Sequence, residues 1–197
     1  MSAGSAGHPL DARIEALVVS PGHNYWFHSR DPADGVGPHP TSYPDHVDVV
    51  AGQGIRGDRF YGKVSQLASA VSFFAAEALE AVEDELGLTA GSLDPRLARR
   101  NIVVRGIDLN ALRHKTFSLD SGDGLVEFEA SGETSPCAWM DDRLAPGARN
   151  ALRGRGGLRA NPTTSGTLRV GRVMLVTDAL QDPALAGARV RRRSRLP

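Results

Sequence analysis

Cys137, the only cysteine in the chain, is the residue whose side chain could do the most specialised chemistry. It follows Ser135 and Pro136, which should form a turn, and it precedes an arginine-containing run, GRGGLR, that ends at Arg159. A thiolate can attack an electrophile, carry a sulfur atom or ligate a soft metal, and nearby cations favour that charged form. A lone cysteine can also be a small buried apolar residue. The cationic surroundings favour the functional interpretation.

A second group of candidate residues is formed by four histidines in or beside the long loop at 21–45, namely His23, His28, His39 and His46. Their spacing matches no common zinc pattern, and structural zinc sites usually include cysteines. We therefore favour another use, in which His23 and Asn24 reach the mouth of the site as proton donors.

The elements that must position these residues are mostly short strands. Apolar or alternating runs predict strands at 13–20, 47–51, 99–109, 116–119, 125–130, 157–160, 167–170 and 173–177. The ranges 116–119 and 125–130 are expected to form a hairpin about the turn at 121–124.

The longest helix is expected from Val71 to Leu86. Phe74, Ala78, Val82 and Leu86 recur at every fourth position, and Gly87 would end the helix. Many short strands with few helices indicate a mainly β or α+β fold, in the form of a small β-barrel with flanking helices.

Length and charge bound the domain organisation. The 197 residues predict a disordered tail at 1–12, one domain at 13–178 and an arginine-rich tail at 179–197. The formal net charge is zero, but the last ten residues hold five arginines and no acid, which leaves 18 basic against 23 acidic residues in the rest. This balance argues against a uniformly basic nucleic-acid-binding surface.

The cellular setting follows from what the sequence lacks. One cysteine cannot form an intramolecular disulfide, and the N-terminus has no apolar signal-peptide core. No run approaches the roughly 18 apolar residues that a membrane span needs. We expect a soluble, cytoplasmic protein that has a small-molecule substrate and no membrane or nucleic-acid partner, while its oligomeric state stays open.

Four motifs in this order resemble the MOSC domain: GIRGDRF, RRNIVVRGIDL, SPCAWMD and GRGGLRA–TLRVG. That domain is found at the C-terminus of molybdenum-cofactor sulfurases, in mitochondrial amidoxime reductases and in small stand-alone bacterial proteins. The resemblance covers about residues 14–178 and implies a β-barrel with flanking helices, in agreement with the strand pattern.

The resemblance implies that Cys137 either ligates molybdenum in a bound pterin cofactor or carries a persulfide. Because the pterin ends in an anionic phosphate, the site must also offer cations and backbone amides. The candidate cofactor-binding residues are Arg59, Arg100, Asn101, Ser135, Arg155, Gly156, Gly157 and Arg159. Each arginine could instead be a solvated charge or an ion-pair partner of Asp58, Asp108 or Asp141. Arg155 and Arg159 are expected to enter the same pocket as Cys137, because the glycines between them let the backbone turn tightly.

Three functions follow as alternatives. In the first, the protein is a molybdenum-cofactor oxidoreductase that reduces N-hydroxylated compounds with electrons from a partner protein. In the second, Cys137 takes a persulfide from a cysteine desulfurase and transfers the sulfur to a cofactor or metabolite. In the third, the barrel binds an anionic ligand without catalysis. Pyridoxal phosphate is expected only in relatives fused to a desulfurase, since neither Lys63 nor Lys115 has a convincing setting for a Schiff base.

Overall fold

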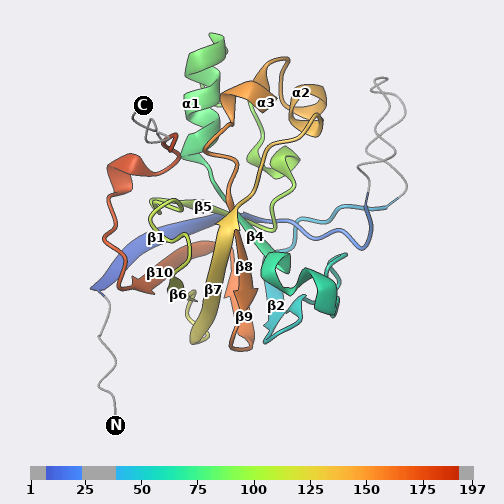
Figure 1. Cartoon of the computed structure of the whole chain (residues 1–197), viewed down its shortest axis with the longest axis vertical. Coiled ribbons are helices and arrows are strands. Elements are labelled where there is room, and N and C mark those ends of the chain that lie inside the picture. Colours follow the sequence, from blue (N-terminus) through green and yellow to red (C-terminus); the bar gives the residue numbers. More distant parts are fainter. Residues whose placement is uncertain (1–7, 24–38, 191–197) are drawn as a thin grey trace, which may run out of the picture.

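The computed structural model describes residues 8–23 and 39–190, and their main feature is a closed seven-stranded barrel (Figure 1). Around the barrel the strand order is β1-β10-β6-β7-β8-β4-β5. Only the β4–β5 pair is parallel; the other pairs of neighbours are antiparallel. The strands are β1 (His8–Leu17), β4 (Val71–Ala75), β5 (Ile102–Arg105), β6 (Thr116–Asp120), β7 (Leu125–Glu133), β8 (Leu158–Pro162) and β10 (Gly171–Thr177). The predicted β-barrel is confirmed.

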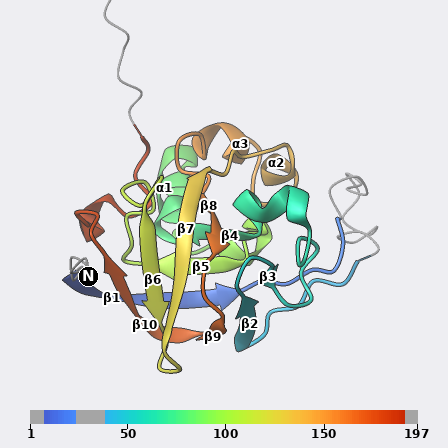
Figure 2. The same cartoon turned by 60° about the horizontal axis from the view of Figure 1, so that its bottom comes forward.

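A smaller sheet is attached to the side of the barrel, as Figure 2 shows. It has the order β3-β2-β9, with both pairs antiparallel. Its strands are β2 (His46–Val50), β3 (Gly54–Ile55) and β9 (Gly166–Arg169). Because β9 follows β8 directly along the chain, the small sheet is continuous in sequence with the barrel wall.

The barrel interior is filled by aromatic and branched aliphatic side chains. Phe73, Phe117 and Phe128 are fully buried, and their ring centroids lie 5.1–5.4 Å apart. Phe117 and Phe128 are cross-strand partners of the β6–β7 hairpin, stacked with an interplanar angle of 21°. The alternation that predicted this hairpin therefore identified the inward-facing side chains, as expected when one face of a strand is buried.

Short helices cover one end of the barrel (Figure 1). They are α1 (Glu77–Leu86), α2 (Trp139–Arg143) and α3 (Ala148–Ala151), with 3₁₀ turns η3 (Val64–Ser69), η4 (Pro95–Ala98) and η5 (Pro183–Leu185). A second buried cluster lies beneath the α helices and includes Phe74, Val82, Trp139, Met140 and Leu152. This cluster forms the floor on which the segment carrying Cys137 rests.

The expected helix from Val71 to Leu86 is wrong over its first third. Residues 71–75 form strand β4, and α1 begins only at Glu77, although Gly87 ends it in the left-handed conformation as predicted (φ 66°). Phe73 packs in the barrel core, whereas Phe74 packs in the cluster under the helices. A strand buried on both faces has no alternation, so its apolar run cannot be told from a helix by periodicity.

Both ends of the described chain extend the ordered structure beyond the expected domain limits. β1 begins at His8, which pairs with Thr177, so residues 8–12 are strand rather than tail. After β10 the chain continues along the barrel: Gln181 exchanges hydrogen bonds with the Asp108 backbone, and Arg189 donates to the Ala151 carbonyl oxygen at 2.8 Å. Of the tails expected at 1–12 and 179–197, the parts at 1–7 and 191–197 lie outside the described residues.

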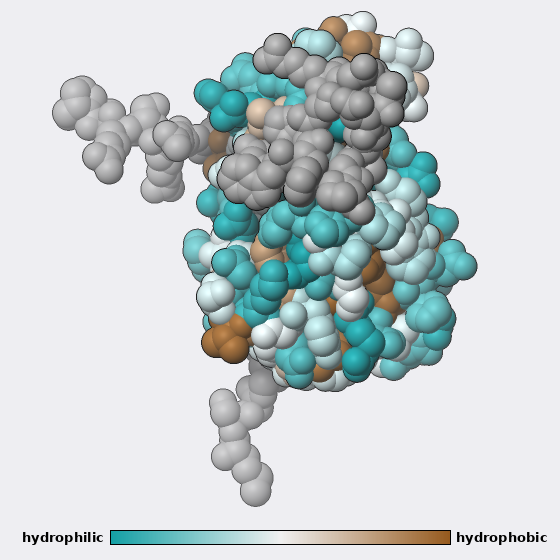
Figure 3. Space-filling model, turned by 90° about the vertical axis from the view of Figure 1, so that its right-hand side faces the viewer, coloured by the Kyte–Doolittle hydropathy of each residue, from teal (hydrophilic) through white to brown (hydrophobic). Residues whose placement is uncertain are grey.

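The surface on the side of β2 and η3 is mostly hydrophilic, with small separated hydrophobic patches (Figure 3). Among the helices of residues 8–23 and 39–190, none has the length and hydrophobicity required to span a bilayer.

Candidate functional site

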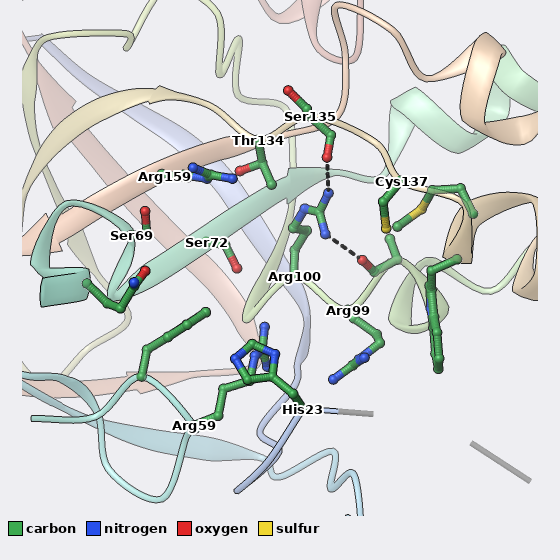
Figure 4. Close-up of a pocket in the computed structure, with 15 residues that line it drawn as sticks. His23, Arg59, Ser69, Ser72, Arg99, Arg100, Thr134, Ser135, Cys137 and Arg159 are labelled. Atoms are coloured by element: carbon green, nitrogen blue, oxygen red, sulfur yellow. Dashed lines mark hydrogen bonds between the residues drawn. The ribbon is translucent and has the colours of Figure 1, made fainter. Parts of the chain in front are cut away.

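A cavity of about 430 Å³ lies between strand β4 and helix α2, which contribute Ser72 and, from α2, Trp139 and Met140 to its lining. Its walls come from separate parts of the chain: the segment after β1, the loop after β3, η3, the start of β4, the η4–β5 connection, the segment from β7 into α2, and β8 (Figure 4). Its lining includes one thiol, one imidazole and four guanidinium groups, from Cys137, His23, Arg59, Arg99, Arg100 and Arg159. A thiol and several cations are thus brought together from across the sequence.

Cys137 is half-buried in the wall of this cavity, just before α2. Its carbonyl oxygen accepts a hydrogen bond from the Met140 amide at 3.0 Å, which starts the helical turn. Trp139 and Met140 are buried beneath it, and the Trp139 indole donates to the Leu97 carbonyl oxygen at 2.8 Å. The residues that follow the cysteine therefore hold it at the surface of the hydrophobic cluster instead of inside it.

Arg100 lies at the centre of the site (Figure 4). Its guanidinium donates to three carbonyl oxygens, those of Ala98 at 3.0 Å, Gly156 at 3.1 Å and Ser135 at 3.4 Å. Burial lowers the pKa of Arg100 to about 10, so the group is still a cation at neutral pH. A buried cation tied to two loops fixes both the Cys137 segment and the chain leading into β8.

Arg99, like Thr134, lines the cavity although the sequence interpretation did not name it. It has left-handed backbone geometry (φ 54°) at the end of η4, and its guanidinium lies over the Trp139 ring at 4.7 Å. Burial, followed by the charge of Arg59, lowers the pKa of Arg99 to about 10. The sequence signal for Arg99 as a site residue was its position next to Arg100 in the RRN motif. Side chains of adjacent residues usually point in opposite directions, and here the left-handed turn at the end of η4 brings both arginines to the cavity.

Several polar atoms of the cavity lining are buried and lack a partner among the described residues. They are Arg59 Nε, Arg99 Nη2 and Thr134 Oγ1. Buried N–H groups without partners are rare in folded proteins because each costs free energy. The lining of this cavity therefore combines four guanidinium groups with buried donors that have no acceptor among the described residues.

Asp58 and Asn101 form the support beneath these cations. The Asp58 carboxylate, with a side chain that is 0% exposed, contacts Arg59 Nη1 at 3.4 Å and accepts from Asn101 Nδ2 at 3.0 Å. Asn101 Oδ1 in turn accepts from the Ser72 backbone amide and hydroxyl, at 3.0 and 2.8 Å. Asn101, which was predicted as a cofactor contact, is 2% exposed and positions the residues that line the cavity.

Gly156 and Gly157, which were predicted as cofactor-binding residues, instead permit close packing of the backbone. A β-carbon on Gly156 would lie 2.2 Å from the Thr134 carbonyl oxygen, and one on Gly157 would lie 2.2 Å from the Phe73 carbonyl oxygen. Neither glycine lines the cavity. They allow the chain entering β8 to lie directly against the Cys137 segment and β4.

A family model described as the MOSC domain matches residues 46–177, which is most of the barrel and all of the site except His23. The chain belongs to the MOSC domain family. MOSC domains are associated with binding of the molybdenum cofactor. A search of curated proteins gave no match.

Solved structures show the same fold at low sequence identity. The chain is similar to the YuaD protein from Bacillus subtilis, with a TM-score of 0.63, 17% identity, and coverage of 87% of this chain and 98% of that one. It is also similar to YiiM from Geobacillus stearothermophilus, with a TM-score of 0.56, 14% identity, and coverage of 84% and 75%.

The MOSC barrel brings together only part of the residue set expected from the sequence. Four of the candidate cofactor-binding residues line the cavity with Cys137: Arg59, Arg100, Ser135 and Arg159. Arg159 forms no ion pair within the described part of the chain, so its charge is available to a ligand.

The expectation that Arg155 shares this pocket is wrong. Its guanidinium contacts Glu85 of α1 at 3.3 Å and lies near Arg189, outside the cavity lining. Of the two arginines, only Arg159 reaches the cavity lining, whereas Arg155 pairs with Glu85. Burial and the charge of Arg189 lower the pKa of Arg155, while Glu85 opposes this shift.

The histidines of the long loop have separate positions. His23 lines the cavity and packs edge-on against Phe60 with ring centroids 5.2 Å apart, while His39 and His46 lie outside the lining. Asn24 and His28 are outside the described residues. Burial and then the charges of Arg59, Arg99 and Lys63 lower the pKa of His23, so its imidazole is neutral at neutral pH. Within residues 8–23 and 39–190, no three His, Cys, Asp or Glu side chains are grouped to hold a metal.

Proposed function

We propose that this MOSC protein binds a molybdenum cofactor in the cavity, with Cys137 as a protein ligand of the metal, and reduces N-hydroxylated small molecules. The observation that carries the proposal is that the only thiol of the chain shares one cavity with four guanidinium groups. A soft thiolate suits a molybdenum centre, whereas guanidinium forks suit the phosphate of the pterin.

The hydrogen-bond donors in the cavity lining fit the anionic phosphate of a molybdenum cofactor. Arg59 Nε and Arg99 Nη2 are buried donors that lack acceptors, and Thr134 adds a hydroxyl without a partner. Arg159 adds a charge that forms no ion pair with a described residue. An anionic phosphate would satisfy these donors, while Arg100, already bonded to three carbonyl oxygens, would mainly hold the site in shape.

The protein's own residues would contribute binding, orientation and protons. The bound cofactor would supply the electrons that break the N–O bond of the substrate. That reduction consumes two electrons and two protons and releases water. Because His23 lies at the cavity with a lowered pKa, we propose it as the group that relays these protons to the substrate oxygen. The electrons would come from a partner, because one cysteine cannot hold an iron–sulfur cluster.

The accessible position of Cys137 also supports a second candidate, a sulfur carrier. The thiol is half-buried at a cavity wall, so another protein's persulfide could approach it. In that reaction the Cys137 thiolate attacks the outer sulfur of the donor's persulfide, a new S–S bond forms on Cys137, and the donor leaves as a thiolate. A cysteine desulfurase would be the partner, and Arg99 and Arg100 would stabilise the anionic persulfide. The predicted cytoplasmic location suits both candidates and stays a prediction.

The test is to purify the whole protein from a host that makes the molybdenum cofactor, and to measure molybdenum, pterin fluorescence and intact mass. The proposal expects molybdenum and pterin in equal amounts, and reduction of an N-hydroxylated base by a chemical electron donor. A mass increase of one sulfur atom on Cys137, with no molybdenum, would support the carrier instead. Protein that holds neither would leave the third alternative, an anion-binding barrel without catalysis.

A further inference from the structure

A second, larger cavity lies on the other side of the segment that carries Cys137. Its volume is about 660 Å³, within the usual range for small-molecule sites. Four arginines line it, namely Arg113, Arg149, Arg153 and Arg189, against a single acid, Glu133. Ser135 lines both cavities, so the segment 134–136 is the partition between them.

The walls of this second cavity are fixed by interactions between distant parts of the chain. Glu133, at the end of β7, accepts from the Gly154 amide at 3.1 Å and faces Arg113 at 3.8 Å. Gly154 accepts from the Val190 amide at 3.0 Å, which ties the C-terminal segment to the rim. Three segments are therefore held in place before any ligand arrives, which reduces the entropic cost of binding.

The charges of the cavity are not balanced by the protein. Arg113 is paired with Glu133, and Arg189 contacts Glu85 at 2.8 Å. Arg149 and Arg153 are exposed and form no ion pair with any residue in 8–23 or 39–190. The guanidinium groups of Arg149 and Arg153 thus have no acidic partner among these residues, and those of Arg113 and Arg189 lie in the same concave lining. This arrangement suits an anion that carries at least two negative charges.

We propose that this cavity is a second binding site, distinct from the Cys137 cavity, for a small multiply charged anion such as a phosphorylated metabolite. Arg149 and Arg153 bind the anion directly, and Arg113 and Arg189 form its sides. The concave shape and the small number of apolar residues in the lining favour a small polar ligand over a protein surface. This site does not depend on the cofactor or the reaction proposed above.

The probe for the test is inorganic pyrophosphate, titrated into the full-length protein at near-physiological salt and followed by amide NMR. The Gly154 amide reports the second cavity, and the Ser72 amide reports the Cys137 cavity. We expect the Gly154 signal to shift and saturate. The double variant Arg149→Gln/Arg153→Gln should raise the Kd reported by Gly154 by at least about tenfold, and leave the response of Ser72 unchanged.

Two control variants separate a specific site from general attraction to positive charge. Arg159→Gln should alter only the Ser72 response. Arg13→Gln/Arg172→Gln removes two cross-strand arginines on β1 and β10, which line neither cavity, and should alter neither response. The proposal is overturned if Gly154 does not saturate, or if the β1–β10 double variant weakens binding at Gly154 as much as Arg149→Gln/Arg153→Gln does.

Discussion

The Arg100 guanidinium donates to the Gly156 carbonyl oxygen at 3.1 Å, across 56 residues of sequence. This hydrogen bond joins the chain entering β5 to the chain entering β8, and a further donation to the Ser135 carbonyl oxygen at 3.4 Å includes the Cys137 segment. A single buried cation therefore sets the relative positions of three loops. The geometry of the candidate site depends on this connection as much as on the residues that would contact a ligand.

Replacement of Cys137 by serine should remove the proposed function without unfolding the protein. The thiol is half-buried and serine is nearly isosteric, so stability should change by no more than about 1 kcal/mol. Molybdenum content and turnover should fall to background, because a serine hydroxyl is a poor soft ligand. Metal analysis and thermal unfolding of the variant check both parts. Ser92→Ala, at an exposed position that lines neither cavity, serves as the control, and a fully active Cys137→Ser protein would place the chemistry elsewhere.

Gly156→Ala should destabilise the protein by at least about 2 kcal/mol, since overpacking against backbone cannot be relieved by rotation of a side chain. The added β-carbon would lie 2.2 Å from the Thr134 carbonyl oxygen and 3.0 Å from Pro136 Cδ. Urea unfolding measures the loss. Gly132→Ala is the matched control, because the nearest atom to its new β-carbon would be 3.9 Å away. Equal stability of the two variants would contradict the close packing of the Gly156 loop against the Cys137 segment.

Asn101→Ala should cost about 2–3 kcal/mol, because several buried groups lose their hydrogen-bond partner at once. The Ser72 amide and hydroxyl lose their acceptor, the Val18 carbonyl oxygen loses its side-chain donor, and Asp58 loses one of its donors. Loss of the support for Asp58 should also weaken anion binding at Arg59. Chemical denaturation and a pyrophosphate titration of the folded variant test these effects. The exposed Asn150→Ala on α3 should behave like the unmodified protein in both measurements.

The protein should lose stability on acidification partly through His23. The folded-state pKa of His23 lies below its ordinary value of 6.5, because of burial first and then the charges of Arg59, Arg99 and Lys63. Protonation therefore favours the unfolded chain: the stability due to neutral His23 is fully present above pH 6.5 and declines as the pH falls from there through the folded-state pKa. The melting temperature of His23→Gln should fall less than that of the unmodified protein between about pH 7 and about pH 5.

NMR titration of the His23 ring separates the causes of this shift. Arg59→Gln should raise the pKa of His23, since it removes the largest charge contribution, and Arg56→Gln should leave it unchanged because Arg56 is exposed and contacts Asp48. If Arg59→Gln leaves the pKa of His23 where it was, the arginines do not act on the imidazole as the geometry requires.

The amino-acid sequence by itself determined the barrel and the centre of the site. Alternation along 125–130 and the turn at 121–124 predicted the β6–β7 hairpin, because a strand with one buried face has apolar residues at every second position. The structure confirms the hairpin and pairs Phe117 with Phe128 in it. The four motifs in order identified the MOSC family, and with it the position of Cys137 and of Arg100 and Arg159 beside it. The hairpin is encoded by residues close together in the sequence, and the family is encoded by the order of the four motifs along the chain.

Only the tertiary structure decided which other residues take part. Residues 71–75 are strand because parallel pairing with β5 and antiparallel pairing with β8 bury both of their faces, and neither partner is near in sequence. Arg155 was expected in the pocket but contacts Glu85, 70 residues away, whereas Arg99 enters the pocket through a left-handed turn. The direction of a long charged side chain depends on the nearest opposite charge in space, which local sequence patterns do not contain.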